Sequence, residues 1–327
     1  MLRLGVATDA ETLARVRDPL AARDIEAVHV PTAERTVDLT APDEAYPEVD
    51  VGFVYPPRLA EGGVADALLE IPWVNGREAV LRSRHKGEAL ARLGAAGVPT
   101  PDSVVVSNPT DEAAVLDAIE RVGTPAVVKP NSATRGIGVA KVGDADSLLG
   151  VTDYLDLLHE FPATGDRSFL VQSLVPAARD LRVMCVDGEC VGAVERRLPA
   201  ADRERGRWKH NVHRGAEATG VDLPDSLRDL AERAAAALDI PWLGIDLLVP
   251  ERDAARSDGA DGDTETGPRT ESETRTETRS DSLDALAHDR AVVNETNARP
   301  TVDTATKYEP DFYDRLAGLI RQTARGE

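Results

Sequence analysis

The stretch Pro125-Ala-Val-Val-Lys-Pro-Asn-Ser-Ala-Thr-Arg-Gly-Ile-Gly-Val-Ala-Lys141 decides how the rest of the chain is interpreted. Two runs rich in β-branched residues, Ala126 to Val128 and Ile137 to Val142, flank a polar loop with Gly136, which predicts two antiparallel strands. Lys129 ends the first strand, and a lysine beside the N–H groups of a glycine-containing turn suits phosphate oxygens. The loop is not a Walker motif, because the Gly-x4-Gly-Lys-Ser/Thr order is absent. Taken alone, the stretch fits a solvated hairpin equally well.

The composition limits the partners of this chain. Its 327 residues carry a net charge of −20, from 58 acidic and 38 basic residues. Such a surface repels nucleic acid and anionic lipid, so neither is expected, and a nucleotide site needs a local cluster of cations. An acid-rich, lysine-poor surface suits a salt-adapted, halophilic cytoplasm. Since an ammonium and a guanidinium are not interchangeable, the five lysines are candidates for chemistry: Lys86, Lys129, Lys141, Lys209 and Lys307.

We expect a cytoplasmic protein that does not enter a membrane. The N-terminus lacks the long apolar core of a signal peptide, and no run approaches the ~18 apolar residues of a membrane span. Two cysteines, Cys185 and Cys190, do not suggest a secreted disulfide scaffold. They would face each other across the Asp187-Gly188 turn, which leaves a disulfide open, but reduced core thiols are favoured.

Three units are expected along the chain. Residues 1–83 alternate strands and helices, which implies a small parallel sheet, and they lack a Gly-x-Gly-x-x-Gly fingerprint. Pro19 is expected to interrupt the first helix. Residues 84–168 form a compact α+β unit around the hairpin, and residues 169–327 form a second one. The expected fold class is therefore a combination of α/β and α+β.

Residues 251–282 contain no Val, Ile, Leu, Met or aromatic residue. Such a segment cannot bury enough apolar surface to order itself, so we interpret it as a disordered acidic insert within the last unit. The strands on either side of it, Trp242 to Val249 and Ala291 to Asn297, would then form a simple hairpin.

Those two strands carry candidate metal ligands. Asp246 lies mid-strand among apolar residues, where a carboxylate is costly to bury unless it is paired or bound to a metal. Glu295 and Asn297 alternate on the second strand and therefore point to one face. If the strands are neighbours, the three residues cluster oxygen ligands of the kind that Mg²⁺ takes beside phosphates. A solvated barrel mouth and a buried Asp–Arg pair are the alternatives.

A cationic stretch runs from Asp202 to Arg214, which is unusual in so acidic a chain. His210 and His213 in this stretch offer a second metal hypothesis. Their spacing of three suits one face of a helix, whereas the stretch predicts a loop or a strand, and no further ligands gather there.

Seven segments between residues 75 and 300 form one ordered set: Lys86 ahead of Leu-Gly-Ala-Ala-Gly-Val-Pro-Thr-Pro, the Val-Val-Lys-Pro and Gly-Ile-Gly-Val hairpin, Gln172, Asp180-Leu-Arg182, Asn211-Val-His-Arg-Gly215, Gly-Ile-Asp246 and Glu295-Thr-Asn297. Together they resemble the ATP-grasp ligases, and the RimK-type glutamate ligase branch in particular. The resemblance covers residues 75 to 300 in the order of the family, interrupted only by the acidic insert.

The resemblance implies an ATP-grasp architecture, with an N-terminal domain (1–83) and two subdomains (84–168 and 169–327) that clasp the nucleotide. Residues implied to contact ATP are Lys86 and Lys129 at the phosphates, Ser173 and Leu174 at the adenine through the backbone, Asp180 at the ribose, and Lys209 and Asn211 elsewhere on the nucleotide. The implied ligands of Mg²⁺, with Mn²⁺ as an alternative, are Asp246, Glu295 and Asn297. The residues implied to steady an acyl phosphate and the carboxylate substrate are Arg182, Arg197 and Arg214.

The implied activity is ATP-dependent ligation of a carboxylate to an amine through an acyl phosphate, with glutamate or a similar amino acid as the amine. A nucleotide-binding sensor or scaffold without turnover is the alternative. The sequence leaves the acceptor open, as well as the choice between a monomer and a homo-oligomer. Two positions depart from the branch. Ser173 stands where an acidic residue is usual, which concerns the adenine contact, and Arg299-Pro300 replaces a Gly-containing turn, which concerns the acceptor pocket.

We predict that residues 251–282 are dispensable for folding, because they carry no large apolar side chain. Replacing them with a short Gly/Ser turn should leave the melting temperature and the affinity for ATP nearly unchanged. Thermal melting and nucleotide titration check this, and a collapse in soluble yield would contradict it.

Overall fold

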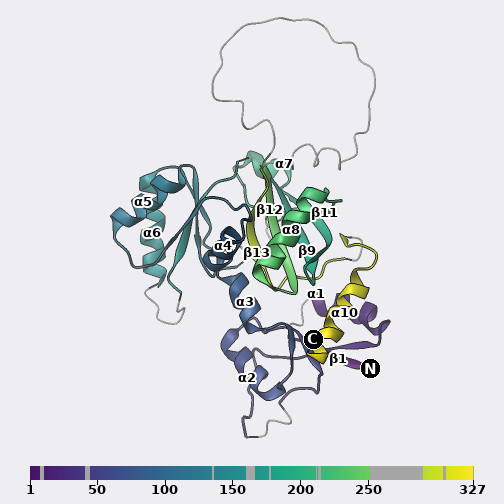
Figure 1. Ribbon diagram of the computed structural model, residues 1–327. Helices are drawn as coiled ribbons and strands as arrows, with labels where there is room; N and C mark the ends of the chain where they lie inside the picture. The colour runs from purple at the N-terminus through teal and green to yellow at the C-terminus, as the bar shows by residue number, and fades with distance from the viewer. Residues whose placement is uncertain are drawn as a thin grey trace, which may run out of the picture.

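The computed structural model describes residues 1–7, 11–40, 45–134, 136–159, 166–176, 178–210, 212, 215–250, 290–304 and 307–326. The acidic insert lies outside these residues, as do Asn211, His213 and Arg214. The described chain forms three sheets with their helices, in an elongated arrangement that has the central unit beside the C-terminal one and the N-terminal unit below both (Figure 1). No helix within the described ranges is both long and apolar enough to span a bilayer.

The N-terminal unit is built on a four-stranded sheet in the order β2-β1-β3-β4. All three strand pairs are parallel, which confirms the sheet type expected from the alternation of strands and helices. Its elements are β1 (Leu2–Val6), α1 (Glu11–Ala21), β2 (Ile25–His29), β3 (Val51–Val54), α2 (Leu59–Leu69), β4 (Trp73–Asn75) and α3 (Arg77–Arg84).

The prediction that Pro19 interrupts the first helix is wrong, because α1 continues to Ala21. Proline has no N–H to donate to the carbonyl four residues earlier, which here is that of Arg15. The hydroxyl of Tyr313, from the C-terminal helix, donates to this carbonyl at 3.3 Å. A tertiary contact therefore supplies the hydrogen bond that the helix itself cannot make.

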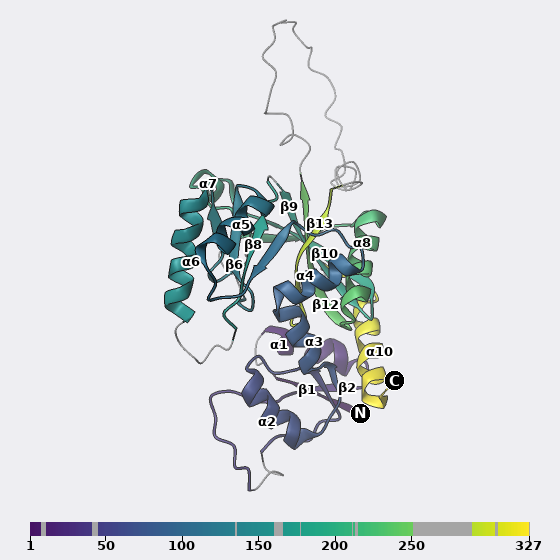
Figure 2. The same cartoon turned by 60° about the vertical axis from the view of Figure 1, so that its left-hand side comes forward.

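The central unit is a four-stranded sheet in the order β5-β8-β6-β7, covered by two helices (Figures 1 and 2). The opening hairpin is present as an antiparallel pair of β6 and β7, although the second strand is shorter than expected. The strand β8 pairs with β5 and β6, so this sheet extends past residue 168, where the unit was expected to end. The elements are β5 (Ser103–Val106), α5 (Glu112–Val122), β6 (Ala126–Pro130), β7 (Ala140–Val142), α6 (Ala145–His159) and β8 (Phe169–Ser173).

The C-terminal unit is a five-stranded antiparallel sheet in the order β11-β10-β9-β12-β13. Asp187 and Gly188 both have positive φ, as the two-residue turn between β9 and β10 requires. Cys185 and Cys190 pair across this hairpin as buried free thiols, as expected. The elements are β9 (Ala178–Val186), β10 (Glu189–Arg197), α7 (Ala200–Glu204), β11 (Glu217–Gly220), α8 (Asp225–Leu238), β12 (Trp242–Pro250), β13 (Val292–Asn297) and α10 (Phe312–Arg325), with α4 (Lys86–Ala95) packed against α8 and β13.

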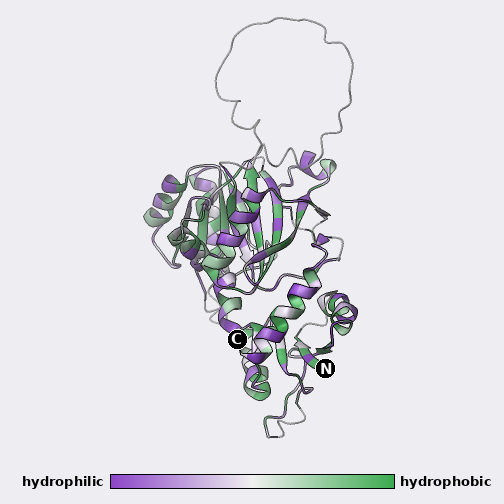
Figure 3. Cartoon of the chain, turned by 45° about the vertical axis from the view of Figure 1, so that its right-hand side comes forward, coloured by the Kyte–Doolittle hydropathy of each residue, from purple (hydrophilic) through white to green (hydrophobic). Residues whose placement is uncertain are grey.

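Two separate hydrophobic cores hold these units. One core runs continuously through the N-terminal and C-terminal units, and it includes the fully buried Trp242, whose ring lies 6.1 Å from that of Phe53 and 5.9 Å from that of Phe312. The central unit has its own core around Val128, Leu148 and the strands beside them. The helices are banded in hydrophilic and hydrophobic colours, as expected for helices with one face on a core (Figure 3). The N-terminal and C-terminal units are therefore one packed body, and the central unit is a second.

Asn75 joins the N-terminal unit to the C-terminal one. Its side chain is fully buried, accepts a hydrogen bond from the N–H of Trp242 at 3.0 Å, and donates to the carbonyls of Trp242 and Ala298 at 2.5 and 2.7 Å. It therefore satisfies three buried backbone groups, each of which is costly to leave without a partner.

We predict that Asn75→Ala lowers the free energy of unfolding by about 2–4 kcal/mol, because it strands these buried groups. Chemical denaturation of the wild type and the variant measures the change. The exposed Thr110 gives a control, since Thr110→Ala should change stability by less than roughly 0.5 kcal/mol. Equal stability of the two variants would show that Asn75 does not join the units.

Candidate active site

Two lysines and two carboxylates meet where the central unit faces the C-terminal sheet. We call them the lysine–carboxylate cluster: Lys86, Lys129, Asp246 and Glu295. Asp246 on β12 lies directly opposite Glu295 on β13, so the two side chains share a face of the sheet. This confirms the hairpin expected beneath the insert. The Nζ atom of Lys86 lies 3.5 Å from a carboxylate oxygen of Glu295.

Lys129 is buried at the end of β6, with 4% of its surface exposed. Its Nζ atom donates to the side-chain oxygen of Gln172 on β8 at 2.8 Å. Burial lowers the pKa of Lys129 to about 8, the charges of Glu295 and Asp246 oppose this shift, and Lys86 adds to it. These four charges act on one another although they come from both packed bodies. A buried ammonium with few local partners is suited to bind an anion.

Lys86 opens helix α4 and fixes the start of the polar loop after β6. Its Nζ atom donates to the carbonyls of Asn131, at 3.4 Å, and of Ala133. The side chain of Asn131 accepts from the N–H of Gly87 at 2.8 Å and donates to Asp166 at 3.2 Å. The loop is therefore held between α4 and the segment that leads into β8, beside both lysines.

Asp246 is enclosed by arginines. Arg182 binds both of its carboxylate oxygens, at 2.7 and 2.8 Å, and Arg196 approaches one of them at 3.0 Å. Arg196 also binds Asp180. Burial alone would raise the pKa of Asp246, but the two arginines hold it below its usual range. The buried Asp–Arg pair considered as an alternative is therefore present, and it occurs together with the neighbouring Glu295.

Asp180 differs from Asp246 although both bind Arg196. Burial raises the pKa of Asp180, Arg196 opposes this, and the charge of Asp246 adds to the rise. His210 lies 3.7 Å from Asp180, and burial and the nearby arginines lower the pKa of this imidazole. Asp180, which is expected to contact the ribose, therefore already contacts Arg196 and His210.

The donor set of the expected metal ligands fits Mg²⁺. Asp246 and Glu295 supply carboxylate oxygens, and the side-chain oxygen of Asn297 lies on the same strand as Glu295 and accepts from the N–H of Arg299 at 2.9 Å. Hard oxygen donors of this kind suit Mg²⁺ when phosphates complete the shell. Within the described ranges, no group of three or more His, Cys, Asp and Glu residues gathers as a metal cluster. His213, on which the histidine hypothesis depends, lies outside these ranges.

Two adjacent arginines at the end of β10 point to opposite faces of the sheet. Arg196 shares the face of Asp180 and Asp246, whereas Arg197 binds Glu195 at 2.8 Å with about half of its side chain exposed. Glu195 is also held by Arg179 on that second face. Arg197 is the residue expected from the resemblance, whereas Arg196, which was not among the expected residues, lies on the face of Asp246. The signal that favours Arg196 is the alternation of side chains along β10 relative to Asp180 on β9.

The remaining candidates lie around the central unit. The N–H groups of Ser173 and Leu174 donate to the carbonyls of Asp102 and Pro125 at 2.8 and 3.2 Å, so a backbone contact with adenine would use their carbonyls. Lys209 donates to the carbonyl of Val139, which links the cationic stretch to the loop after β6. The placement of Asn211 and Arg214 is outside the described residues.

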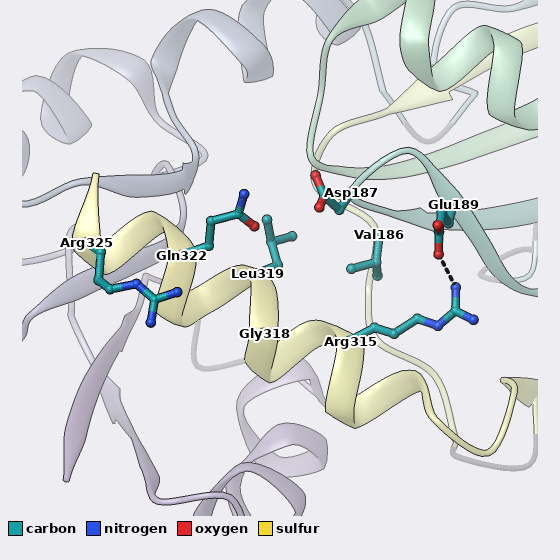
Figure 4. A pocket seen from close by; sticks show the side chains of 8 residues that line it. All are labelled: Val186, Asp187, Glu189, Arg315, Gly318, Leu319, Gln322 and Arg325. Carbon is teal, nitrogen blue, oxygen red and sulfur yellow. Dashed lines mark hydrogen bonds and ion pairs between the residues drawn. The ribbon is translucent and has the colours of Figure 1, made fainter. Parts of the chain in front are cut away.

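A pocket of about 330 Å³ lies elsewhere, between the turn after β9 and helix α10 (Figure 4). Arg315 and Glu189 form an ion pair of 2.6 Å at its edge. The pocket is lined by none of the candidate site residues, and it is separate from the lysine–carboxylate cluster.

Comparisons with known proteins agree with this geometry. A family model described as a RimK-like ATP-grasp domain matches residues 83–255, more than half of the chain. A probable alpha-L-glutamate ligase of Stenotrophomonas maltophilia is 31% identical over 181 residues, which are 54% of this chain and 57% of that protein. A ribosomal protein bS6–L-glutamate ligase of Escherichia fergusonii is 29% identical over 55% of this chain and 56% of its own length. The chain thus spans a little over half the length of these relatives.

Solved structures show the same fold over nearly the whole chain. A RimK domain ATP-grasp protein of Sphaerobacter thermophilus superposes with a TM-score of 0.60 at 22% identity, covering 99% of this chain and 100% of its own. The D-alanine–D-alanine ligase of Bacillus anthracis gives 0.62 at 16% identity, covering 100% of this chain and 98% of its own. A D-cycloserine synthetase gives 0.64 at 19% identity, covering 98% and 99%. The expected architecture is therefore confirmed.

We predict a specific pH dependence of stability from Lys129. Because its pKa is lower in the folded chain, the unfolded chain holds the proton more tightly between about pH 8 and pH 10.5, and the free energy of unfolding rises with pH in that window. A pKa that falls from 10.5 to about 8 corresponds to about 3 kcal/mol. The stability of the wild type relative to Lys129→Met should rise by that amount across the window.

Denaturant titrations at several pH values measure this difference in the free energy of unfolding. The contributions of titrating groups that the two proteins share cancel in the difference. Lys141→Met, which removes an exposed lysine, is the matched control and is measured in the same way. A flat difference for Lys129→Met would mean that Lys129 keeps an ordinary pKa.

Proposed function

The chain belongs to the RimK-like ATP-grasp family, and from this premise we propose that it is an ATP-dependent carbon–nitrogen ligase. It would join a carboxylate to an amine through an acyl phosphate. The observation that carries the proposal is the lysine–carboxylate cluster, in which the Lys86–Glu295 pair of 3.5 Å and the buried Lys129 lie beside Asp246. Cations and oxygen ligands at one place suit the transfer of a phosphoryl group.

The two lysines would receive the phosphates of ATP. Both are nearly buried, at 6% and 4% exposure, so their charges are weakly screened by water. Lys86 also holds the carbonyls of Asn131 and Ala133, which keeps the polar loop close to the phosphates that it would cover. Lys209 is proposed to assist from the other side of this loop, through its contact with Val139.

Asp246, Glu295 and Asn297 are the residues proposed to hold Mg²⁺. When bound, the ion would supply positive charge at the phosphate oxygens. Glu295 is the more accessible carboxylate, with 36% of its side chain exposed, against 8% for Asp246. The arginines around Asp246 keep it ionised, so this carboxylate can act as an oxygen ligand at neutral pH.

Arg182 and Arg196 are proposed to stabilise the acyl phosphate. Both lie on the sheet face of Asp246 and Glu295, and Arg182 keeps 28% of its side chain exposed. A guanidinium presents several donors in one plane, which suits the oxygens of a phosphoryl group that leaves ATP for a carboxylate. Arg214, expected from the resemblance, stays a proposal without a described position, and Arg197 is proposed only for a surface contact.

Glutamate is the proposed amine, because the curated relatives are named as glutamate ligases. The second candidate is an ATP-binding sensor or scaffold without turnover. Three oxygen ligands beside two buried lysines favour the enzyme, since a protein that only binds nucleotide has no need of a shared metal site at the phosphates.

Release of inorganic phosphate distinguishes the two candidates. The protein is mixed with ATP, Mg²⁺, L-glutamate and panels of carboxylate acceptors, and phosphate is measured together with the mass of the acceptor. A mass gain that depends on ATP and glutamate supports the ligase. Binding of ATP without phosphate release or mass gain on any panel supports the sensor.

We predict that Glu295→Gln abolishes turnover, by at least about 100-fold, while the protein still folds. The substitution removes one charge with little change in shape, and it removes the carboxylate that pairs with Lys86 and whose charge also acts on Lys129. Phosphate release and thermal melting measure the two effects. Glu217→Gln, at an exposed position of β11, is the matched control and should keep full activity. Full activity of Glu295→Gln would exclude Glu295 as a metal ligand.

A further inference from the structure

Two arginines, Arg84 and Arg299, meet at a loop of the N-terminal unit. Arg84 is the last residue of α3, and Arg299 follows β13 directly after the proposed metal ligands. Arg84 donates to the carbonyl of Pro57 at 3.0 Å, and Arg299 donates to the carbonyl of Tyr55. Because these carbonyls are two residues apart on one loop, the two guanidinium groups lie beside each other.

Within the part of the chain that the structure describes, this pair has no carboxylate partner. No ion pair there includes Arg84 or Arg299, and each guanidinium group donates to a backbone carbonyl instead. Other partly or fully buried arginines of the chain bind carboxylates closely, such as Arg179 with Glu195 and Arg228 with Glu309, both at 2.8 Å. The two adjacent arginines differ from these, since no carboxylate of the described residues pairs with either of them.

Bringing two like charges together away from bulk water costs free energy unless an anion is shared between them. The charge of Arg84 acts on Arg299, as expected for two neighbouring guanidinium groups. An anion that binds between them would offset their mutual repulsion.

The position of the pair connects it to the lysine–carboxylate cluster. Lys86 follows Arg84 by two residues, and Arg299 follows Glu295 by four, while Lys86 and Glu295 are themselves 3.5 Å apart. The two arginines therefore lie between the lysine–carboxylate cluster, which is the proposed phosphate site, and the loop of the N-terminal unit that they contact. A small molecule that reacts at the cluster could extend to them.

We propose that Arg84 and Arg299 bind a carboxylate group of the substrate, so that the ligase takes an acidic substrate whose second carboxylate lies at the N-terminal unit. This rests on the proposed function for the reacting end of the substrate. The fork of a guanidinium matches a carboxylate through two parallel hydrogen bonds, and two guanidinium groups can share one such anion. The carboxylate belongs either to the incoming amino acid or to the acceptor.

Isothermal titration of the whole protein, with ADP and Mg²⁺ present, tests the site with two probes. L-Glutamate represents the incoming amino acid, and N-acetyl-L-glutamate, which has no free amine, represents the acceptor. Arg84→Gln and Arg299→Gln should each weaken binding of one of these probes by about 10- to 100-fold, as expected for the loss of a charged hydrogen-bond donor. The affected probe identifies the source of the carboxylate.

Three controls keep the result specific. Arg77→Gln, on the same helix but with 54% of its side chain exposed, should bind both probes like the wild type. Arg299→Lys keeps the charge without the fork and should weaken binding less than Arg299→Gln, and it replaces that variant if the latter does not fold. ATP affinity, measured separately on every variant, should change less than about twofold.

Unchanged binding of both probes by Arg84→Gln and Arg299→Gln would overturn the proposal, as would an equal loss in Arg77→Gln. A parallel loss of ATP affinity would also overturn it, because the arginines would then belong to the nucleotide site. Wild-type protein that binds ATP but neither probe refutes the carboxylate site and leaves the ligase proposal standing. Wild-type protein that binds a carboxylate probe but releases no phosphate with any acceptor refutes the ligase proposal instead.

Discussion

The pairing of β12 with β13 places Asp246 directly opposite Glu295, and the rest of the site follows from this contact. Two carboxylates on neighbouring strands repel each other, so the fold must bring cations to them. Arg182 and Arg196 approach Asp246 along the sheet, and Lys86 approaches Glu295 from helix α4. Lys129 comes from the other packed body. The strand register thus determines which basic residues can be buried.

The continuous core of the N-terminal and C-terminal units holds the site residues of these two units in fixed positions relative to each other. Trp242, which begins β12, packs between Phe53 and Phe312, and its backbone is held by Asn75. The loop from β3 to α2 therefore keeps its place relative to β13, and the carbonyls that receive Arg84 and Arg299 are part of this fixed frame. Geometry between these groups does not depend on the central unit.

Much of this arrangement is predictable from the sequence, because strand periodicity and turn residues are local signals. The apolar setting of Asp246 and the alternation of Glu295 and Asn297 were enough to place these proposed metal ligands on one face. The choice between Arg196 and Arg197 needs the register against β9, which one sequence does not provide. Helix α1 continues past Pro19, and the carbonyl that proline leaves without a helical donor is bound by the hydroxyl of Tyr313, almost 300 residues away in the chain. The pairing of Arg84 with Arg299 also depends on such distant packing.

The separate core of the central unit has a consequence for how the molecule unfolds. A unit with its own hydrophobic interior can lose its structure without opening the rest, so its backbone amides exchange with solvent at a free energy of their own. Lys129 belongs to this unit, whereas Asp246 and Glu295 belong to the other body. A ligand that binds across both bodies would couple two otherwise independent transitions, and calorimetry would record one cooperative event in place of two.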